Sequence, residues 1–181
     1  MESIVLFSLF ILIPLFYYRV IKKKTWDEIK KELLPKNKEL KKELIGSLKL
    51  FGILILGFLV IATTISAIEI IFNIQINDMD NVANFIKNGF ITPIFFILSL
   101  TIIVFIEEFF FRAFLQKNIG ILFSTIIFTF FHLGYESITQ TIGVFFLGLI
   151  LAYWFKKNNS IIQNYFGHLL YNLLAVILYL I

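Results

Sequence analysis

Long apolar segments are the feature that most constrains the fold of this 181-residue chain. Inside a bilayer every backbone amide needs a hydrogen-bond partner, so an apolar run of about 20 residues predicts a membrane-spanning helix. Only 15% of the residues are charged, compared with about 25% in soluble domains. We therefore predict an all-α, polytopic membrane bundle of about six transmembrane helices. The expected spans are residues 3–18, 45–72, 93–117, 121–133, 138–155 and 160–181.

The positive charge is concentrated, because most of the lysines lie between Lys22 and Lys49. A basic segment between apolar spans predicts a cytoplasmic loop that faces anionic membrane lipids. A nucleic-acid partner is not expected, since no soluble basic face or stacking platform is present. A second basic pair, Lys156-Lys157, falls on the same side by parity. We expect a multi-pass protein of the cell membrane with both termini outside.

Residues 22–44 alternate basic, acidic and apolar side chains, with Trp26, Ile29 and Leu33 on one helical face. Thr25 and Glu28 fit a capping box, and Pro35 divides the segment into two short helices. This pattern predicts an amphipathic cytoplasmic hairpin on the inner leaflet, and a solvated charged linker is the alternative. Within one integrated membrane domain, residues 1–92 hold the first spans and this hairpin, and residues 93–181 form a four-helix core.

Between Pro93 and Leu115 of the third span only three residues are ionisable: Glu107, Glu108 and Arg112. A charge at the centre of a membrane helix costs roughly 2.5–3.5 kcal/mol on insertion scales, so intramembrane charges predict a functional site. Glu108 and Arg112 are four residues apart with the acid first, the favourable order for a helical ion pair. Glu107 points about 100° away from Glu108 and is left for another role.

The only two histidines of the chain, His132 and His168, also lie in apolar segments. Counted from the inner ends of their helices, both lie at about the depth of the glutamates, near the bilayer midplane. Asn172 shares a helix face with His168. Such groups suit the activation of water by a carboxylate, with a histidine to orient it and neutral donors for an oxyanion. The structural alternative is a buried ion pair with polar packing residues between helices.

Three motifs resemble those of the CPBP intramembrane protease family, which comprises CaaX proteases and bacteriocin-processing proteins and is also called the Abi family. They are EExxxR at residues 107–112, FxxxH at residues 128–132 and HxxxN at residues 168–172. The resemblance covers residues 93–181 and implies an intramembrane endopeptidase. By position it implies that Glu107 and His132 activate water, that His168 and Asn172 stabilise the oxyanion, and that Glu108 and Arg112 support Glu107.

The resemblance leaves the catalytic type open between a glutamate-dependent protease and a metalloprotease. Glu107, His132 and His168 could hold zinc with an open water position, but no HExxH motif is present and we favour the metal-free mechanism. The expected substrate is a peptide or lipidated protein at the membrane. Two other functions compete: a non-catalytic immunity or scaffold protein that binds a peptide or partner, and a proton-coupled transporter.

Overall fold

The computed structural model describes residues 2–34, 39–88 and 93–180, and over these ranges the chain is almost entirely helical. This confirms the predicted all-α membrane bundle. Within these ranges, three helices (α3, α7 and α8) are each long and apolar enough to cross a bilayer alone. The elements are α1 (Glu2–Phe16), η1 (Tyr17–Ile21), α2 (Trp26–Leu33), α3 (Leu40–Phe72), α4 (Met79–Asn88), α5 (Pro93–Glu107), η2 (Glu108–Gln116), α6 (Lys117–Phe130), η3 (Leu133–Tyr135), α7 (Ile138–Asn158) and α8 (Ile161–Leu180).

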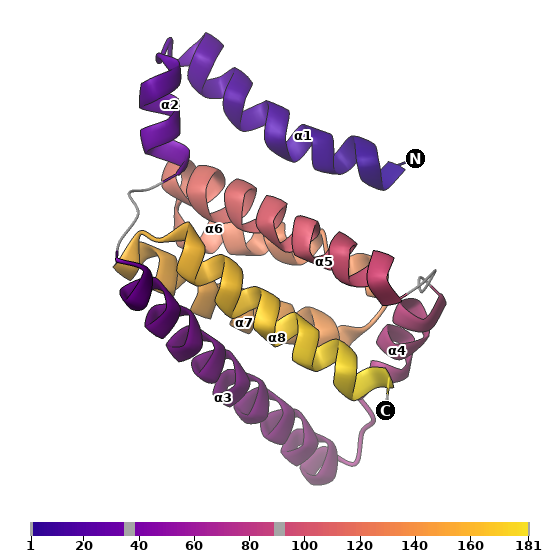
Figure 1. Cartoon of the computed structure of the whole chain (residues 1–181). Helices are drawn as coiled ribbons and strands as arrows, with labels where there is room; N and C mark the ends of the chain where they lie inside the picture. Colours follow the sequence, from indigo (N-terminus) through magenta and orange to yellow (C-terminus); the bar gives the residue numbers. More distant parts are fainter. Residues whose placement is uncertain (1, 35–38, 89–92, 181) are drawn as a thin grey trace.

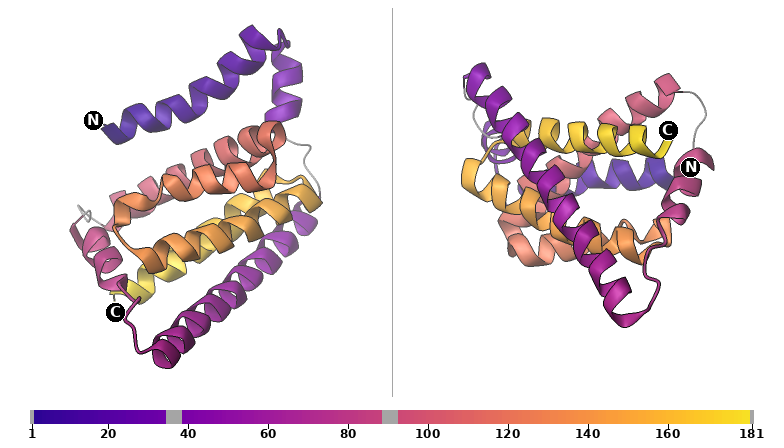
Figure 2. Two further views of the ribbon diagram at one scale, coloured as in Figure 1. Left: turned by 180° about the vertical axis from the view of Figure 1, so that it is seen from behind. Right: turned by 90° about the horizontal axis from the view of Figure 1, so that it is seen from below.

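Helix α8 is the centre of the bundle, because it packs against α3, α5, α7 and η2. On the far side of the molecule α6, α7 and α3 follow one another as neighbours (Figure 2). Both termini lie at the end of the bundle that carries α4, whereas α2 and the start of α3 lie at the opposite end (Figure 1). The bundle therefore has two distinct ends, and the basic residues 22–24, 117 and 156–157 belong to the end with α2.

The expected hairpin at 22–44 is present only as its first helix. Thr25 and Glu28 make the predicted capping box, with the Glu28 carboxylate 2.7 Å from the Thr25 backbone nitrogen. Ile29 and Leu33 are buried against the phenylalanines of η2. No second short helix precedes residue 45, because α3 runs unbroken from Leu40 to Phe72 and nothing between residues 40 and 45 interrupts it. The expected break at Pro35 lies outside the described residues.

The third span ends close to residue 117, its expected end. α5 and the π-helical η2 form one continuous rod, and the helix direction changes at Gly120, whose φ of 85° is open to glycine but strained for other residues. The first span continues through Pro14 to Phe16 and then widens into the π turn η1. Ser160 begins the last span as expected, since its hydroxyl accepts from the Gln163 nitrogen at 3.2 Å.

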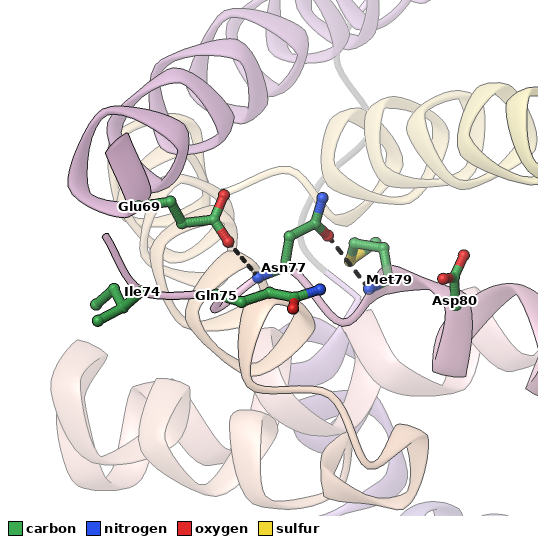
Figure 3. A pocket seen from close by; sticks show the side chains of 6 residues that line it. All are labelled: Glu69, Ile74, Gln75, Asn77, Met79 and Asp80. Carbon is green, nitrogen blue, oxygen red and sulfur yellow. Dashed lines mark hydrogen bonds between the residues drawn. The ribbon is translucent and has the colours of Figure 1, made fainter. Parts of the chain in front are cut away.

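Glu69 has a structural role at the α4 end of the bundle. One carboxylate oxygen accepts from the backbone nitrogens of Ile76 and Asn77 at 2.7 and 2.6 Å. These bonds hold the chain as it turns from α3 toward α4 and shape the polar pocket shown in Figure 3. The carboxylate is thus used to satisfy loop amides that have no helical partner.

Candidate active site

The site begins with Glu108, whose side chain is fully buried at the start of η2. One carboxylate oxygen accepts from His168 Nδ1 at 2.8 Å, and the other accepts from Asn164 Nδ2 at 3.1 Å. Arg112 Nε lies 3.6 Å from the same carboxylate, and this side chain is also completely buried. A buried charge is tolerated only when it is paired and hydrogen-bonded, and Glu108 meets both conditions.

Phe128, the first residue of the FxxxH motif, packs against two other residues of the site. Its ring is 3% exposed and lies under the Arg112 guanidinium, 4.6 Å from ring centroid to carbon. The same ring approaches His132, with centroids 4.4 Å apart. Gly148 leaves the room for it, because a Cβ there would meet Phe128 Cδ1 at 3.2 Å. Phe128 therefore supports both the arginine and the histidine through cation–π and ring contacts.

Glu107 and His132 form a separate and more open pair. Their Oε1 and Nε2 atoms are 3.9 Å apart, and the side chains keep 13% and 16% of their exposure. His132 Nδ1 lies 2.8 Å from the Phe128 carbonyl oxygen, which can only accept, so Nδ1 carries the proton. In the neutral ring Nε2 then presents a lone pair toward Glu107. A water with hydrogen bonds of about 2.8 Å to both atoms would join them at an angle of roughly 90°.

His168 and Asn172 are placed differently from each other. His168 is 6% exposed and is held by Glu108 through Nδ1. Asn172 lies one helical turn further along α8 and is half-buried. No side-chain hydrogen bond joins Asn172 to any other residue in the described part of the chain. The structure thus brings Glu107, Glu108, Arg112, His132 and His168 together from the end of α5, from η2, from the turn after α6 and from α8, and leaves Asn172 at their border.

Two residues of the site were missed from the sequence. Asn164 is completely buried and bridges Glu108 to the Leu151 carbonyl, at 3.1 and 2.9 Å. The sequence could have indicated Asn164, since this polar residue lies four residues before His168 on an apolar helix. Tyr135 stacks on His132, with nearly parallel rings 6.2 Å apart. Burial and the nearby charge of Glu107 raise the pKa of Tyr135 to about 12, so this phenol keeps its proton at neutral pH.

The candidate metal ligands do not fit a three-ligand zinc site in this arrangement. Across the described residues, no three histidine and carboxylate side chains cluster closely enough to share an ion. Glu107 faces His132, whereas His168 is turned to Glu108. Zinc would need all three of its protein ligands within about 2.0–2.2 Å.

One family model matches the part of the chain that carries this cluster. Residues 89–174 match the family described as Rce1-like, type II CAAX prenyl endopeptidase. This range contains every residue of the cluster. Neither the curated proteins nor the solved structures gave a match.

Proposed function

We propose that this membrane protein is an intramembrane endopeptidase in which Glu107 activates water. The proposal is supported by the match of residues 89–174 to the Rce1-like family of type II CAAX prenyl endopeptidases. The observation that carries the proposal is the division between the two glutamates. Glu108 is sealed and fully occupied, whereas Glu107 is partly exposed and faces a histidine lone pair across a gap of one water molecule. Only Glu107 has both the access and the partner that a general base needs.

In the proposed reaction, a water held between Glu107 and His132 attacks the carbonyl carbon of the scissile bond. Glu107 takes one proton of the water as the new carbon–oxygen bond forms, and the carbonyl oxygen becomes an oxyanion. When the carbon–nitrogen bond breaks, the proton passes from Glu107 to the leaving nitrogen. The products are a carboxylic acid and an amine, so one water is consumed for each bond cleaved.

His168 and Asn172 are the proposed donors to the oxyanion. Nδ1 of His168 is engaged with Glu108, which leaves Nε2 to face the reaction. Donation from Nε2 requires a ring that carries both protons, and Glu108 is then its counter-ion. Asn172 lies next to it on the same helix face and has its amide available. One such donor typically contributes a factor of about 100–1,000 in kcat.

The basic end of the bundle is proposed to face the cytoplasm. Lys22, Lys23 and Lys24 lie at this end together with Lys156 and Lys157, and both termini lie at the other (Figure 1). Helix α2 carries further lysines on its exposed side while Ile29 and Leu33 are buried. This distribution agrees with a positive-inside orientation and with contact to anionic lipid. The proposed substrate is a membrane-associated peptide or protein, lipidated or not.

The decisive test is cleavage of lipidated and unlipidated peptides by purified protein in lipid, read by mass spectrometry. Glu107→Gln is expected to abolish cleavage while the protein still inserts and folds. Glu39→Gln is the matched control, because that side chain is 75% exposed and remote from the site. A Glu107→Gln protein that cleaves at the normal rate would refute the role of the base.

A chelator arm belongs to the same experiment. Because the residues do not form a three-ligand set, cleavage is expected to continue when divalent ions are removed. If the wild-type protein cleaves no peptide, and Glu107→Gln keeps the biological effect of the protein, the immunity or scaffold function is supported instead.

A further inference from the structure

The connection after His132 is held by a distant part of the chain. Residues 76–81, which lead from α3 into the start of α4, contact residues 136–139, which lead into the start of α7. The Asn81 amide donates to the Glu136 carbonyl at 2.8 Å, and the Thr139 hydroxyl donates to the Ile76 carbonyl at 3.0 Å. The segment 76–81 lies outside the range of residues 89–174 that matches the family.

Asp78 is the centre of this contact. Its carboxylate accepts from the Ser137 hydroxyl and the Ile138 nitrogen, both at 2.6 Å, and from the Thr139 nitrogen at 3.1 Å. The two nitrogens belong to the first turn of α7 and have no partner within that helix. Burial would raise the pKa of Asp78, but these hydrogen bonds outweigh it and lower the pKa. The carboxylate therefore stays ionised and serves as a cap from outside the helix.

Ser137 links Asp78 to the connection that follows His132. Its hydroxyl donates to Asp78 and accepts from the Gln140 nitrogen at 3.0 Å, so both of its hydrogen-bond directions are fixed. Four residues separate it from His132, and they are tightly turned. The Glu136 nitrogen donates to the Leu133 carbonyl at 3.0 Å, and Glu136 itself has a φ of 52°. Because this connection is short and held by hydrogen bonds, a movement of Ser137 is expected to move the residues between it and His132 as well.

His132 depends on that connection. It lies beyond Phe130, the last residue of α6, so the helix itself no longer fixes its side chain. Three contacts orient the ring: the bond from Nδ1 to the Phe128 carbonyl, the ring of Phe128 itself, and the stacked ring of Tyr135. Tyr135 is part of the connection that Asp78 holds. A shift of Ser137 would therefore move Tyr135 and turn Nε2 of His132 relative to Glu107.

We propose that Asp78 is a positioning residue for His132, acting through Ser137 and Tyr135. It touches neither substrate nor reacting atoms. The orientation of the His132 ring does not depend on any enzymatic activity, whereas its effect on turnover rests on the proposed protease function.

The chain offers a direct test, because it has only two histidines. In protein carrying isotope-labelled histidine, the imidazole Cε1–H signals of His132 and His168 can be assigned with a His132→Gln variant. Asp78→Asn keeps the size of the side chain and removes its charge, so it is expected to shift the His132 signal and leave that of His168 in place. Asp80→Asn is the matched control, with the same change at an exposed residue of the same segment.

Turnover gives the second readout. Asp78→Asn is expected to lower kcat about tenfold with KM within a factor of two, since a misplacement of about 1 Å can cost about 100-fold and the shift expected here is smaller. Asn81→Ala, which removes only the bond to Glu136, should produce a smaller change in the same direction.

The proposal is overturned if the His132 signal of Asp78→Asn coincides with that of wild type, or if His168 moves as much as His132. If the signals move as expected but the wild-type protein cleaves no peptide, the positioning of His132 stands and the proposed protease function fails. The two ideas are thus tested separately.

Discussion

Replacing Asn164 by leucine should weaken the bundle far more than the same change at Asn172. Leucine has nearly the shape of asparagine but no donor, so the change removes two hydrogen bonds without opening a cavity. Glu108 would lose its partner at 3.1 Å, and the Leu151 carbonyl would lose its partner at 2.9 Å. Because Glu108 is fully buried, water cannot replace what is lost.

The size of the effect follows from the two bonds. A hydrogen bond to a charged group contributes about 1.5–3 kcal/mol, and one between neutral groups about 0.5–1.5 kcal/mol. Bonds between membrane helices are weaker on average, about 0.6 kcal/mol, and Glu108 keeps His168 and Arg112. We therefore expect a loss of about 2 kcal/mol for Asn164→Leu, a factor of roughly 25 in the unfolding equilibrium. Asn172→Leu should change the free energy of unfolding by less than about 0.5 kcal/mol.

Unfolding by a denaturing detergent in mixed micelles measures this difference. Trp154 is a suitable probe, since its indole nitrogen donates to Gln163, the neighbour of Asn164, at 3.1 Å. Replacing Trp26, which is 60% exposed, by phenylalanine leaves Trp154 as the single tryptophan. Equal stability of the two variants would refute the assignment of Asn164 as the support of Glu108. Under the proposed mechanism, Asn172→Leu should instead lose activity while staying folded.

Two further predictions concern packing and pH. Gly167→Ala should destabilise the protein by about 1–3 kcal/mol, because its Cβ would meet three side-chain atoms of the fully buried Leu50 at 2.8–3.0 Å. Gly52→Ala, which meets nothing within 4 Å, should be neutral or stabilising by up to about 1 kcal/mol in the same thermal unfolding assay. The pKa of Asp78 is lowered in the folded protein, so its contribution to stability is present above the unfolded pKa of about 3.9 and is lost as the pH falls through the lower, folded value. The difference in melting temperature between wild type and Asp78→Asn should therefore be constant near neutral pH and shrink below about pH 4; a difference that stays constant into that range would contradict this.

Much of the fold could be predicted from local pattern. Apolar length predicted membrane helices, and the Thr25–Glu28 spacing predicted a cap that the structure contains. The continuity of α3 was not predicted. Its first residues, from Leu40, are charged and amphipathic and the rest is apolar, so that the two parts resemble two separate elements in the sequence. A helix continues wherever nothing interrupts its backbone, whatever the environment of each half.

The different environments of Glu107 and Glu108 could also be predicted only in part. Spacing indicated that Glu108 pairs with Arg112 and that Glu107 points elsewhere, and the structure has both features. Spacing gave no preference for which histidine meets which glutamate. That choice depends on how α6 and α8 pack around η2, and it leaves one carboxylate sealed and the other open to water.

The two asparagines of α8 give the clearest case. Asn164 and Asn172 both lie four residues from His168, one before and one after, so both share its face and helical periodicity treats them alike. The motif pointed to Asn172, but only the tertiary structure could show that Asn164 holds the buried carboxylate. A helix fixes the direction of a side chain, and the neighbouring helix at that level decides what the side chain meets. Sequence therefore determined which groups are directed into the core of this protein, and packing decided their partners.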